Sequence, residues 1–396
     1  MAQNQAVLVA GVPSINKALF HRIRFSAHDP AACIDLPGPD GRTRRLLVLR
    51  DVELPRARAH ARADEVFAYA DFTPEEGLSE DRVIAAAQAV AECLRRAGIE
   101  RVVSDRTLPL IYVHELGRAG ISVVCDPMLG VRERRAKDRD EIEAMRRAQH
   151  GTERAIEAAC RTIADAGTEA DGQLVDRATG QRLTSESVKA LIDRVLGEHG
   201  LLGEAHIVAG GPQGGDCHEP GSGPLRTGEP IIVDVFPRDR ETGYHGDCTR
   251  TVVHGEIPER VERMHAAVVA ALEAGLAVIR AGTTGEAVHR AAIGVIQQHG
   301  FSLGFPPAEA PEGFCSMPHG LGHGLGLDLK EPPLLDMGGP ELVVGDAVTV
   351  EPGLYQPGLG GVRVEDLVVV TETGYEMLNQ LPRGLRWDGG SDIEDR

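Results

Sequence analysis

Short apolar runs separated by polar segments open the chain and predict an α/β arrangement in its first third. The runs Leu46–Leu49, Val102–Val103 and Ile121–Cys125 are aliphatic and bounded by polar residues, which is typical of buried strands. Between the first two runs, apolar residues recur at helical spacing from about Asp81 to Ala97. We therefore expect a modest α/β domain here.

An abrupt change in composition near Arg132 to Asp140 indicates a domain boundary, because almost every residue there is charged. Beyond this run, apolar or small positions recur at helical spacing, at Ile142, Met145, Thr152, Ile156 and Ile163. The boundary divides the chain into residues 1–135 and 136–396. The charged run itself is expected to be a solvated linker and first helical turn.

The second domain shows the same order of elements twice: two helices followed by a pair of strands. The first set is predicted at 142–165 and 185–199 (helices) and at 230–236 and 244–254 (strands). The second set is predicted at 258–280 and 284–299 (helices) and at 346–351 and 361–370 (strands). A capping box from Thr283 to Glu286 is expected to begin the last helix, and Gly300 to end it. The repetition indicates a duplicated half-domain.

Each predicted strand pair carries two carboxylates at a similar separation. Asp234 interrupts the apolar run IIVDVF, and Asp247 returns 13 residues later on the partner strand. Glu351, in AVTVEPGLY, and Glu365, in GVRVEDLVVV, are 14 residues apart. A buried and unpaired carboxylate is costly, so these side chains need cations or hydrogen-bond donors. Each hairpin is therefore expected to supply two ligands to one cavity.

Four carboxylates in one cavity carry a charge that two divalent cations would balance. Together with an imidazole, they form a set of oxygen and nitrogen donors that suits Mn²⁺, Co²⁺, Fe²⁺ or Zn²⁺. Such a set differs from a soft thiolate site. An ion pair between Glu365 and Arg363 is the structural alternative for that carboxylate. The sequence predicts a two-metal hydrolytic centre.

The segment MPHGLGHGLGLDLKE supplies the imidazole. His319 and His323 are four residues apart, a spacing that on a helix would suggest a zinc pair, but alternate glycines make a helix improbable there. In an extended segment the two histidines still share one face, and glycines on the other face permit close backbone approach. His218 lies in a turn-rich loop 16 residues before Asp234. By itself it would be an ordinary exposed residue.

Composition excludes several classes of function. The formal net charge of −18 argues against a general affinity for nucleic acid or anionic membrane surfaces and favours small neutral or cationic substrates. The seven cysteines are scattered and form no CxxC pair, which indicates reduced intracellular thiols. The first residues lack a basic segment followed by a long apolar run, so no signal peptide is predicted. A cytoplasmic location is expected.

With these motifs in place, the chain resembles the M24 metallopeptidases, which include Xaa-Pro aminopeptidase, prolidase, methionine aminopeptidase and creatinase. The motifs GYxxDxTRT, HGLGHGLGLD, VEPGLY and VRVED occur in family order. The resemblance implies an α+β fold. A smaller α/β domain of the creatinase type, at 1–135, is followed in the sequence by a pita-bread catalytic domain at 136–396. It also implies hydrolysis of the Xaa-Pro bond at the N-terminus of peptides or in dipeptides, and a homodimer.

The resemblance further implies roles for individual residues. Asp234 would hold one metal, Asp247 and Glu365 would bridge the pair, and His323 with Glu351 would complete the other. Two divalent ions, of which Mn²⁺ is preferred, would hold a bridging hydroxide that attacks the scissile carbonyl, with Glu351 managing its proton. The remaining expected catalytic residues are two histidines that contact the substrate, His218 and His319, and a basic residue, Arg363, that orients Glu365 or meets the substrate.

One departure from the family pattern concerns substrate. Lys330 stands where proline-specific members generally carry a third histidine, and a lysine is a poor proton shuttle at neutral pH. Two alternatives therefore stand beside Xaa-Pro cleavage. One is a hydrolase or lyase of this fold that acts on a small non-peptide substrate. The other is a non-catalytic binding protein of this fold, against which the intact ligand set argues.

Overall fold

The computed structural model describes residues 5–38, 42–203 and 205–387. The chain divides into two compact units, Met1–Arg134 and Arg135–Arg396. Each has its own hydrophobic core. They are described separately below as the N-terminal unit and the C-terminal unit.

The N-terminal unit is built on one six-stranded mixed sheet, in the order β4-β3-β2-β1-β5-β6. Its strands are β1 (Gln5–Gly11), β2 (Ala31–Pro37), β3 (Thr43–Leu49), β4 (Glu65–Ala68), β5 (Arg101–Ser104) and β6 (Ser122–Cys125). Its helices are α1 (Lys17–Ile23), α2 (Leu54–His60), α3 (Arg82–Arg96) and α4 (Leu110–Arg118), and α5 (Val131–Arg135) follows at the division. The three expected strands are confirmed as parts of β3, β5 and β6, although β6 begins one residue later than expected, and the expected helix is α3, capped by Asp81.

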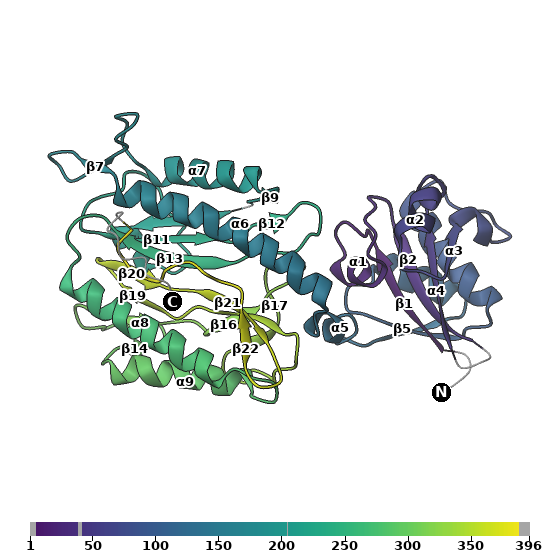
Figure 1. Cartoon of the computed structure of the whole chain (residues 1–396). Coiled ribbons are helices and arrows are strands. Elements are labelled where there is room, and N and C mark those ends of the chain that lie inside the picture. Colours follow the sequence, from purple (N-terminus) through teal and green to yellow (C-terminus); the bar gives the residue numbers. More distant parts are fainter. Residues whose placement is uncertain (1–4, 39–41, 204, 388–396) are drawn as a thin grey trace. The chain divides into compact units, whose positions relative to one another are not determined.

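The C-terminal unit contains the predicted order twice (Figure 1). The first set is α6 (Arg139–Ala164), α7 (Ser185–Glu198), β11 (Pro230–Val235) and β13 (Cys248–Val253). The second set is α8 (Glu259–Val278), α9 (Gly285–Gln298), β18 (Ala347–Val350) and β21 (Asp366–Val370). In both sets the two long strands pair antiparallel. The duplicated order is thus confirmed.

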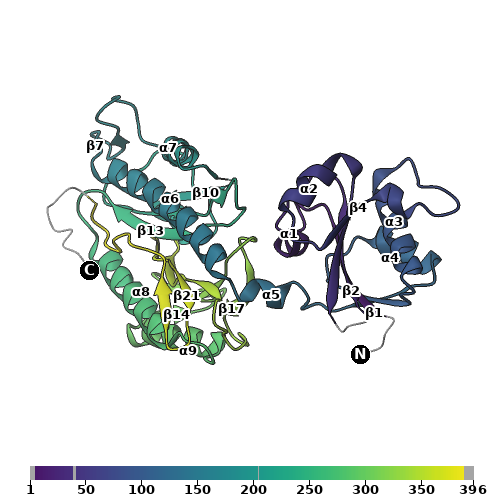
Figure 2. The ribbon, with the colours of Figure 1, turned by 45° about the vertical axis from the view of Figure 1, so that its right-hand side comes forward.

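Shorter strands complete the C-terminal unit. They are β7 (Gly167–Thr168), β8 (Leu174–Val175), β9 (Leu201–Leu202), β10 (His206–Gly210), β12 (Arg238–Asp239), β14 (Ser302–Leu303), β15 (Ser316–Met317), β16 (Gly322–Gly324), β17 (Glu331–Leu335), β19 (Gly353–Gln356), β20 (Gly360–Arg363) and β22 (Tyr375–Met377). The main sheets run β10-β11-β13, β14-β15-β19-β20 and β17-β16-β18-β21-β22. Figures 1 and 2 show the strands of these main sheets as a central layer, with α6 and α7 on one side and α8 and α9 on the other.

Two hydrophobic clusters hold this layered arrangement together. One lies under α6 and α7 and includes Ile156, Ile192 and Val233, all fully buried. The other lies under α8 and α9 and includes Leu272 and Val350. Each helix pair therefore covers its own half of the strand layer, and the ligand-bearing strands lie between the two cores.

Two strand predictions need correction. The apolar stretch 361–370 is not one strand, because it forms β20 and β21 in two different sheets with Glu365 at the break. The strand predicted from 244 begins only at Cys248, so Asp247 precedes it. In both places the chain leaves regular pairing just where a carboxylate must turn toward a cavity, which alternation of apolar residues cannot reveal.

The N-terminus of α9 also differs from its prediction. Thr284, not Thr283, is the capping residue, and its Oγ1 accepts a hydrogen bond from the Ala287 N–H at 3.1 Å. The Glu286 side chain accepts instead from the Gly338 N–H and from Arg290. The helix therefore begins one residue later than its capping box suggested.

The charged run at the division is not simply a solvated linker. Lys137 is buried and donates to Glu331 at 2.6 Å, and Arg135 forms an ion pair of 2.6 Å with buried Asp346. Asp138 caps α6 in a capping box with Glu141. These ion pairs and capping hydrogen bonds hold the start of α6 against the rest of the C-terminal unit.

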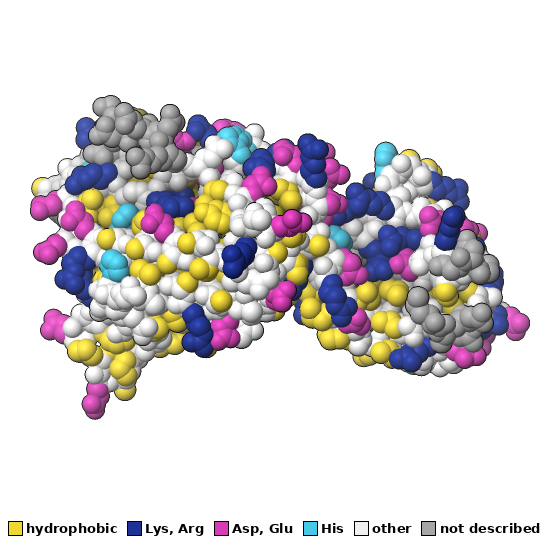
Figure 3. All heavy atoms as spheres, turned by 60° about the horizontal axis from the view of Figure 1, so that its bottom comes forward, with side chains coloured by type: hydrophobic (Ala, Val, Ile, Leu, Met, Phe, Trp, Pro, Cys, Tyr) yellow, Lys and Arg dark blue, Asp and Glu magenta, His cyan; other side chains and the backbone are white. Residues whose placement is uncertain are grey.

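Two properties of the surface bear on function. No helix among the described residues is long and apolar enough to cross a membrane. On the face shown in Figure 3, acidic side chains are scattered among Lys, Arg and neutral groups rather than gathered in one patch. On this face the net negative charge of the chain is therefore not concentrated into a single docking surface.

Candidate metal centre

In the first pair of carboxylates, Asp247 is held by contacts from helix α6. Asp234 lies within β11, and Asp247 lies just before β13. The Gln149 side chain binds both backbone groups of Asp247, since its Nε2 donates to the Asp247 carbonyl and its Oε1 accepts from the Asp247 N–H, each at 2.9 Å. Gly246 allows this approach, because a Cβ there would lie 2.3 Å from Thr152 Oγ1.

The second pair occupies the matching places in the other half. Glu351 follows β18, and Glu365 precedes β21. The Glu365 carboxylate accepts from Thr249 Oγ1 at 2.8 Å, and its backbone N–H donates to the Thr249 carbonyl. Buried Arg250 donates to the Glu365 carbonyl at 2.6 Å and forms an ion pair with Asp366. The first hairpin therefore positions a carboxylate of the second.

The fifth expected ligand, His323, lies on the short strand β16, which confirms the extended conformation of its segment. Its Nδ1 must donate to the Gly324 carbonyl, 3.0 Å away, because a carbonyl oxygen only accepts. This leaves the lone pair of Nε2 free for a cation. The flanking glycines are required, since a Cβ on Gly322 would lie 2.0 Å from the Thr349 carbonyl oxygen.

These side chains converge. Ligand oxygens of Asp234, Asp247 and Glu365 all lie within 4.8 Å of one another. His323 Nε2 lies 3.4 Å from Glu351 Oε1 and 3.8 Å from Asp247 Oδ2. The five groups therefore form one continuous cluster of oxygen and nitrogen donors.

The cluster forms part of the wall of a cavity of about 330 Å³. All the candidate residues proposed from the sequence line it: Asp234, Asp247, His323, Glu351, Glu365, His218, His319 and Arg363. Lys330 lines it too, together with apolar side chains of Ile207, Phe236, Leu329 and Leu334. Polar ligands thus face a partly apolar space large enough for a small molecule.

The electrostatics of the cluster are unfavourable without a cation. Burial raises the pKa of the Asp247 carboxyl well above its usual value, and the charges of Glu365, Asp234 and Glu351 raise it further. Burial also raises the pKa of Glu365, and Glu351 and Asp234 add to the effect. Such carboxyls ionise readily only when positive charge neutralises them.

The structure corrects the expected partner of Arg363. Its guanidinium forms an ion pair with Asp234 at 2.6 Å rather than with Glu365. It also donates to Tyr355 Oη at 2.8 Å and to the Cys217 carbonyl at 3.2 Å. Arg363 is only 3% exposed, so it fixes the orientation of Asp234 from within the cavity wall.

The two other expected histidines differ in their surroundings. His319 Nδ1 donates to the Gly320 carbonyl at 2.7 Å, and its Nε2 lies 2.9 Å from Tyr355 Oη. Burial lowers the pKa of His319, which keeps the imidazole neutral at pH 7. The exposed His218 ring makes no hydrogen bond with any described residue. Of the two, His218 is the one with a free donor facing the cavity.

The donor set fits divalent cations. Asp234 Oδ1 is buried and has no hydrogen-bond partner among the described residues, although Oδ2 of the same carboxylate binds Arg363. A buried oxygen without a donor, beside two more carboxylates and an imidazole lone pair, is the environment that a hard or borderline cation completes.

Several residues that hold the cluster were not found from the sequence: Gln149, Thr249, Arg250 and Tyr355. Gln149 lies on a helix almost 100 residues before its partner, so no local pattern points to it. Tyr355 stands in the VEPGLY motif, only four residues after Glu351, and could have been noticed there.

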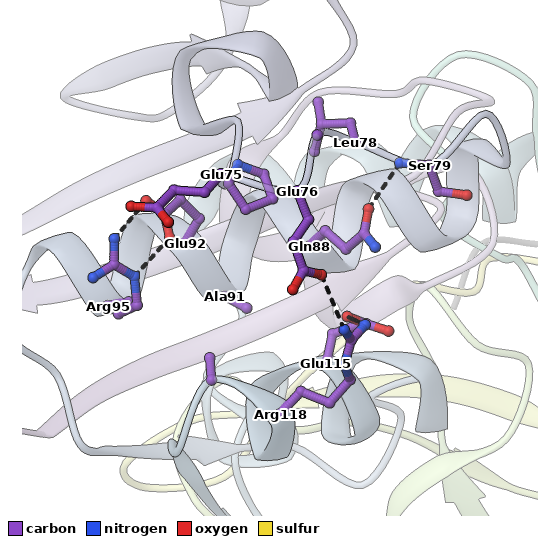
Figure 4. Close-up of a pocket in the computed structure, with 13 residues that line it drawn as sticks. Glu75, Glu76, Leu78, Ser79, Gln88, Ala91, Glu92, Arg95, Glu115 and Arg118 are labelled. Atoms are coloured by element: carbon purple, nitrogen blue, oxygen red, sulfur yellow. Dashed lines mark hydrogen bonds and ion pairs between the residues drawn. The ribbon is translucent and has the colours of Figure 1, made fainter.

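A second hollow, of about 540 Å³, lies on the N-terminal unit between the loop at 74–79 and helices α3 and α4 (Figure 4). Most of its charged side chains are paired with one another. Glu92 binds Arg95 at 2.7 Å, Arg118 binds both Glu115 and Glu76, and Gln88 accepts from the Ser79 N–H. None of the candidate residues lies there. They all line the cavity of the C-terminal unit described above.

Comparison with known proteins agrees with this geometry. Residues 143–372 match the model of metallopeptidase family M24. The chain is 31% identical to the probable dipeptidase PepE of Mycobacterium tuberculosis over 299 residues, which are 75% of this chain and 72% of that protein. It is 27% identical to the Xaa-Pro dipeptidase of Pyrococcus furiosus over 253 residues, 63% of this chain and 64% of that one.

Solved structures show the same fold. The Xaa-Pro dipeptidase from Bacillus anthracis aligns with a TM-score of 0.76 at 21% identity, over 96% of this chain and 94% of that chain. The expected fold class is confirmed: a pita-bread C-terminal domain with a smaller N-terminal domain.

Proposed function

Because the chain belongs to metallopeptidase family M24 and is an enzyme of the hydrolase class, we propose that it cleaves the Xaa-Pro bond of dipeptides or of peptide N-termini with two divalent cations. One observation carries the proposal: three buried carboxylates converge within 4.8 Å, with His323 and Glu351 beside them. The curated relatives named as dipeptidases support a peptide substrate.

We assign the five ligands as follows. Asp234 would hold the first cation, Asp247 and Glu365 would be shared by the two, and His323 and Glu351 would hold the second; the proximity of these groups supports the assignment. Four carboxylates and one imidazole suit Mn²⁺, which is our proposed native metal, and the same donors accept Co²⁺, Zn²⁺ or Fe²⁺. Bound dications would supply a nucleophile near neutral pH by lowering the pKa of water.

The protein's own groups would then act on substrate and proton. The Glu351 carboxylate accepts the proton of the attacking water and returns it to the leaving nitrogen, which in an Xaa-Pro bond carries no N–H. His218 donates toward the oxygen of the scissile carbonyl, where negative charge develops. His319 and Arg363 position the cluster through Tyr355 and Asp234. The apolar walls exclude water around the ring.

Metal content tests this assignment. We expect Asp247→Ala and Glu365→Ala each to lose at least one of two metals per chain, measured by mass spectrometry of the purified, metal-reconstituted protein. The control is Glu372→Ala, which removes an exposed carboxylate distant from the cluster in the turn before β22 and should keep both metals. Two metals retained by both site variants would refute the assignment.

Substrate profiling tests the reaction. Reconstituted protein is assayed with Ala-Pro, Ala-Ala, a longer Xaa-Pro peptide and creatine. We expect cleavage of the Xaa-Pro substrates to dominate. Turnover of creatine alone would favour a hydrolase or lyase of small non-peptide molecules, and metal binding without any turnover would favour a binding protein.

A further inference from the structure

Lys330 is the feature of the cavity that the proposed mechanism does not use. It is exposed, lies just before β17 and lines the same cavity as the five ligands. Its ammonium group makes no ion pair or hydrogen bond with any residue that the structure describes. An unpaired cation in a binding cavity needs an explanation, because most of the other charged groups around it already have ion-pair or hydrogen-bond partners.

The neighbouring charged groups do not pair with Lys330. Asp336, which also lines the cavity, accepts a hydrogen bond from the Met337 N–H and lies 3.7 Å from His289 Nε2. Glu331, the next residue, is not among the residues that line the cavity and is paired with buried Lys137, with side chains 2% and 1% exposed. The other permanent cation of the cavity, Arg363, is committed to Asp234 and Tyr355. The four carboxylates of the cluster would be neutralised by bound metal. Lys330 is therefore the cavity's one free, permanent positive charge among the described residues.

A small ligand with a carboxylate would complete this arrangement. In an Xaa-Pro dipeptide, only the proline Cα separates the terminal carboxylate from the nitrogen of the scissile bond. With the scissile carbonyl at the cluster, the carboxylate therefore stays inside the cavity. In a longer peptide a neutral carbonyl takes that place, and each further residue carries the terminal carboxylate roughly 3.3–3.6 Å farther away. A cavity of about 330 Å³ also fits a ligand of dipeptide size.

We propose that Lys330 is a specificity residue that binds the C-terminal carboxylate of a dipeptide, which makes this enzyme a dipeptidase rather than a peptidase for longer chains. The inference rests on the proposed function for the identity of the scissile bond. The lysine thus replaces proton transfer at this position with recognition of substrate charge, since an ammonium ion is a strong donor to carboxylate.

The test compares charged and neutral substrates with matched variants. Lys330→Met keeps the length of the side chain and removes its charge, and Lys330→Arg keeps the charge. For Ala-Pro we expect Lys330→Met to lower kcat/KM by roughly 10- to 100-fold, mainly through KM, as loss of a charged hydrogen bond does. For Ala-Pro-amide and Ala-Pro-Ala the change should be less than about threefold, and Lys330→Arg should retain most activity on Ala-Pro.

An equal loss on Ala-Pro and on its amide would overturn the proposal, because it would mean that the lysine acts on catalysis or folding. Binding supplies a readout independent of turnover. Calorimetric titration with a reduced-bond analogue of Ala-Pro, which cannot be hydrolysed, should show weaker binding to Lys330→Met, while the amide of that analogue binds both proteins alike.

Failure of the proposed function is distinguishable from failure of this inference. If the wild-type protein cleaves no Xaa-Pro bond, the proposed function fails, and Ala-Leu with its amide then takes the place of the proline substrates. A charge preference that disappears in Lys330→Met would still support the role of the lysine. If the wild-type protein shows no preference for the free carboxylate over the amide with any of these peptides, the proposed role of Lys330 is wrong.

Discussion

Gly221 lies at a close approach between two segments of the C-terminal unit. Its φ of +78° is left-handed, and a Cβ there would lie 1.9 Å from the Val208 carbonyl oxygen of strand β10. We expect Gly221→Ala to lower the free energy of unfolding by roughly 2–5 kcal/mol, since backbone strain and overpacking add. Urea denaturation followed by circular dichroism measures the change.

The matched control for that prediction is Gly180→Ala. Gly180 has a similar φ of +68°, but no atom lies within 4 Å of the place its Cβ would take. It should cost only about 1–2 kcal/mol, from backbone conformation alone. Equal decreases in the free energy of unfolding for the two variants would show that the close approach to Val208 does not contribute to the effect.

At the residue scale, the sequence found the charged groups but not all of their partners. Arg363 and Glu365 alternate along the chain, which suggested an ion pair between them. In the structure the strand breaks at Glu365, so Arg363 turns to Asp234, 129 residues earlier. Local alternation predicts which face a side chain occupies, and it carries no information about which distant strand meets that face.

At the element scale, the cap of helix α9 offers a direct test. Thr284→Ala removes the side chain that accepts from the Ala287 N–H, and we expect it to destabilise the protein by about 1 kcal/mol. Thr283→Ala should change stability by less than about 0.5 kcal/mol, because the Thr283 side chain caps nothing. Chemical denaturation of both variants decides which threonine is the cap. A larger effect at Thr283 would restore the original prediction.

The long elements were predictable and their ends were not. Helices α6, α7 and α8 agree with the predicted ranges to within three residues, because long amphipathic repeats carry a strong periodic signal. The short strands β16 and β20 carry only a few residues each and depend on pairing with distant segments. Their place in the sheets was therefore set by tertiary contacts.

At the scale of the whole molecule, metal removal should destabilise the enzyme in a pH-dependent way. Asp247 and Glu365 have folded-state pKa values above their unfolded values, mainly because they are buried. In the metal-free protein such carboxyls stabilise the fold fully below pH ~4, and this contribution is lost as pH rises through the folded pKa. Bound cations remove the penalty, and they stabilise the folded state by binding it.

We therefore expect a chelator to lower Tm, and to lower it more at pH 8 than at pH 6. Differential scanning calorimetry of metal-loaded and chelated protein at both pH values measures this. The Asp247→Ala variant provides the control, because its Tm should depend less on the chelator. A chelator effect that is larger at pH 6 would contradict the assignment of buried carboxylates as ligands.

The assembly and the location of the enzyme stay predictions. A homodimer is expected from the family resemblance, and sedimentation analysis of the purified chain tests it. A cytoplasmic location is expected from composition. Fractionation of cells that express the tagged protein tests that expectation.

By itself, the sequence determined the layered order of helices and strand pairs, the two carboxylates per hairpin and the extended histidine segment. These properties depend on periodicity and on the cost of burying charge, both of which act locally. Only the tertiary structure decided that Arg363 orients Asp234, that Gln149 clamps Asp247 and that Lys330 is left without a partner. Those outcomes depend on which distant segments meet, and long-range pairing follows from the packing of the whole unit.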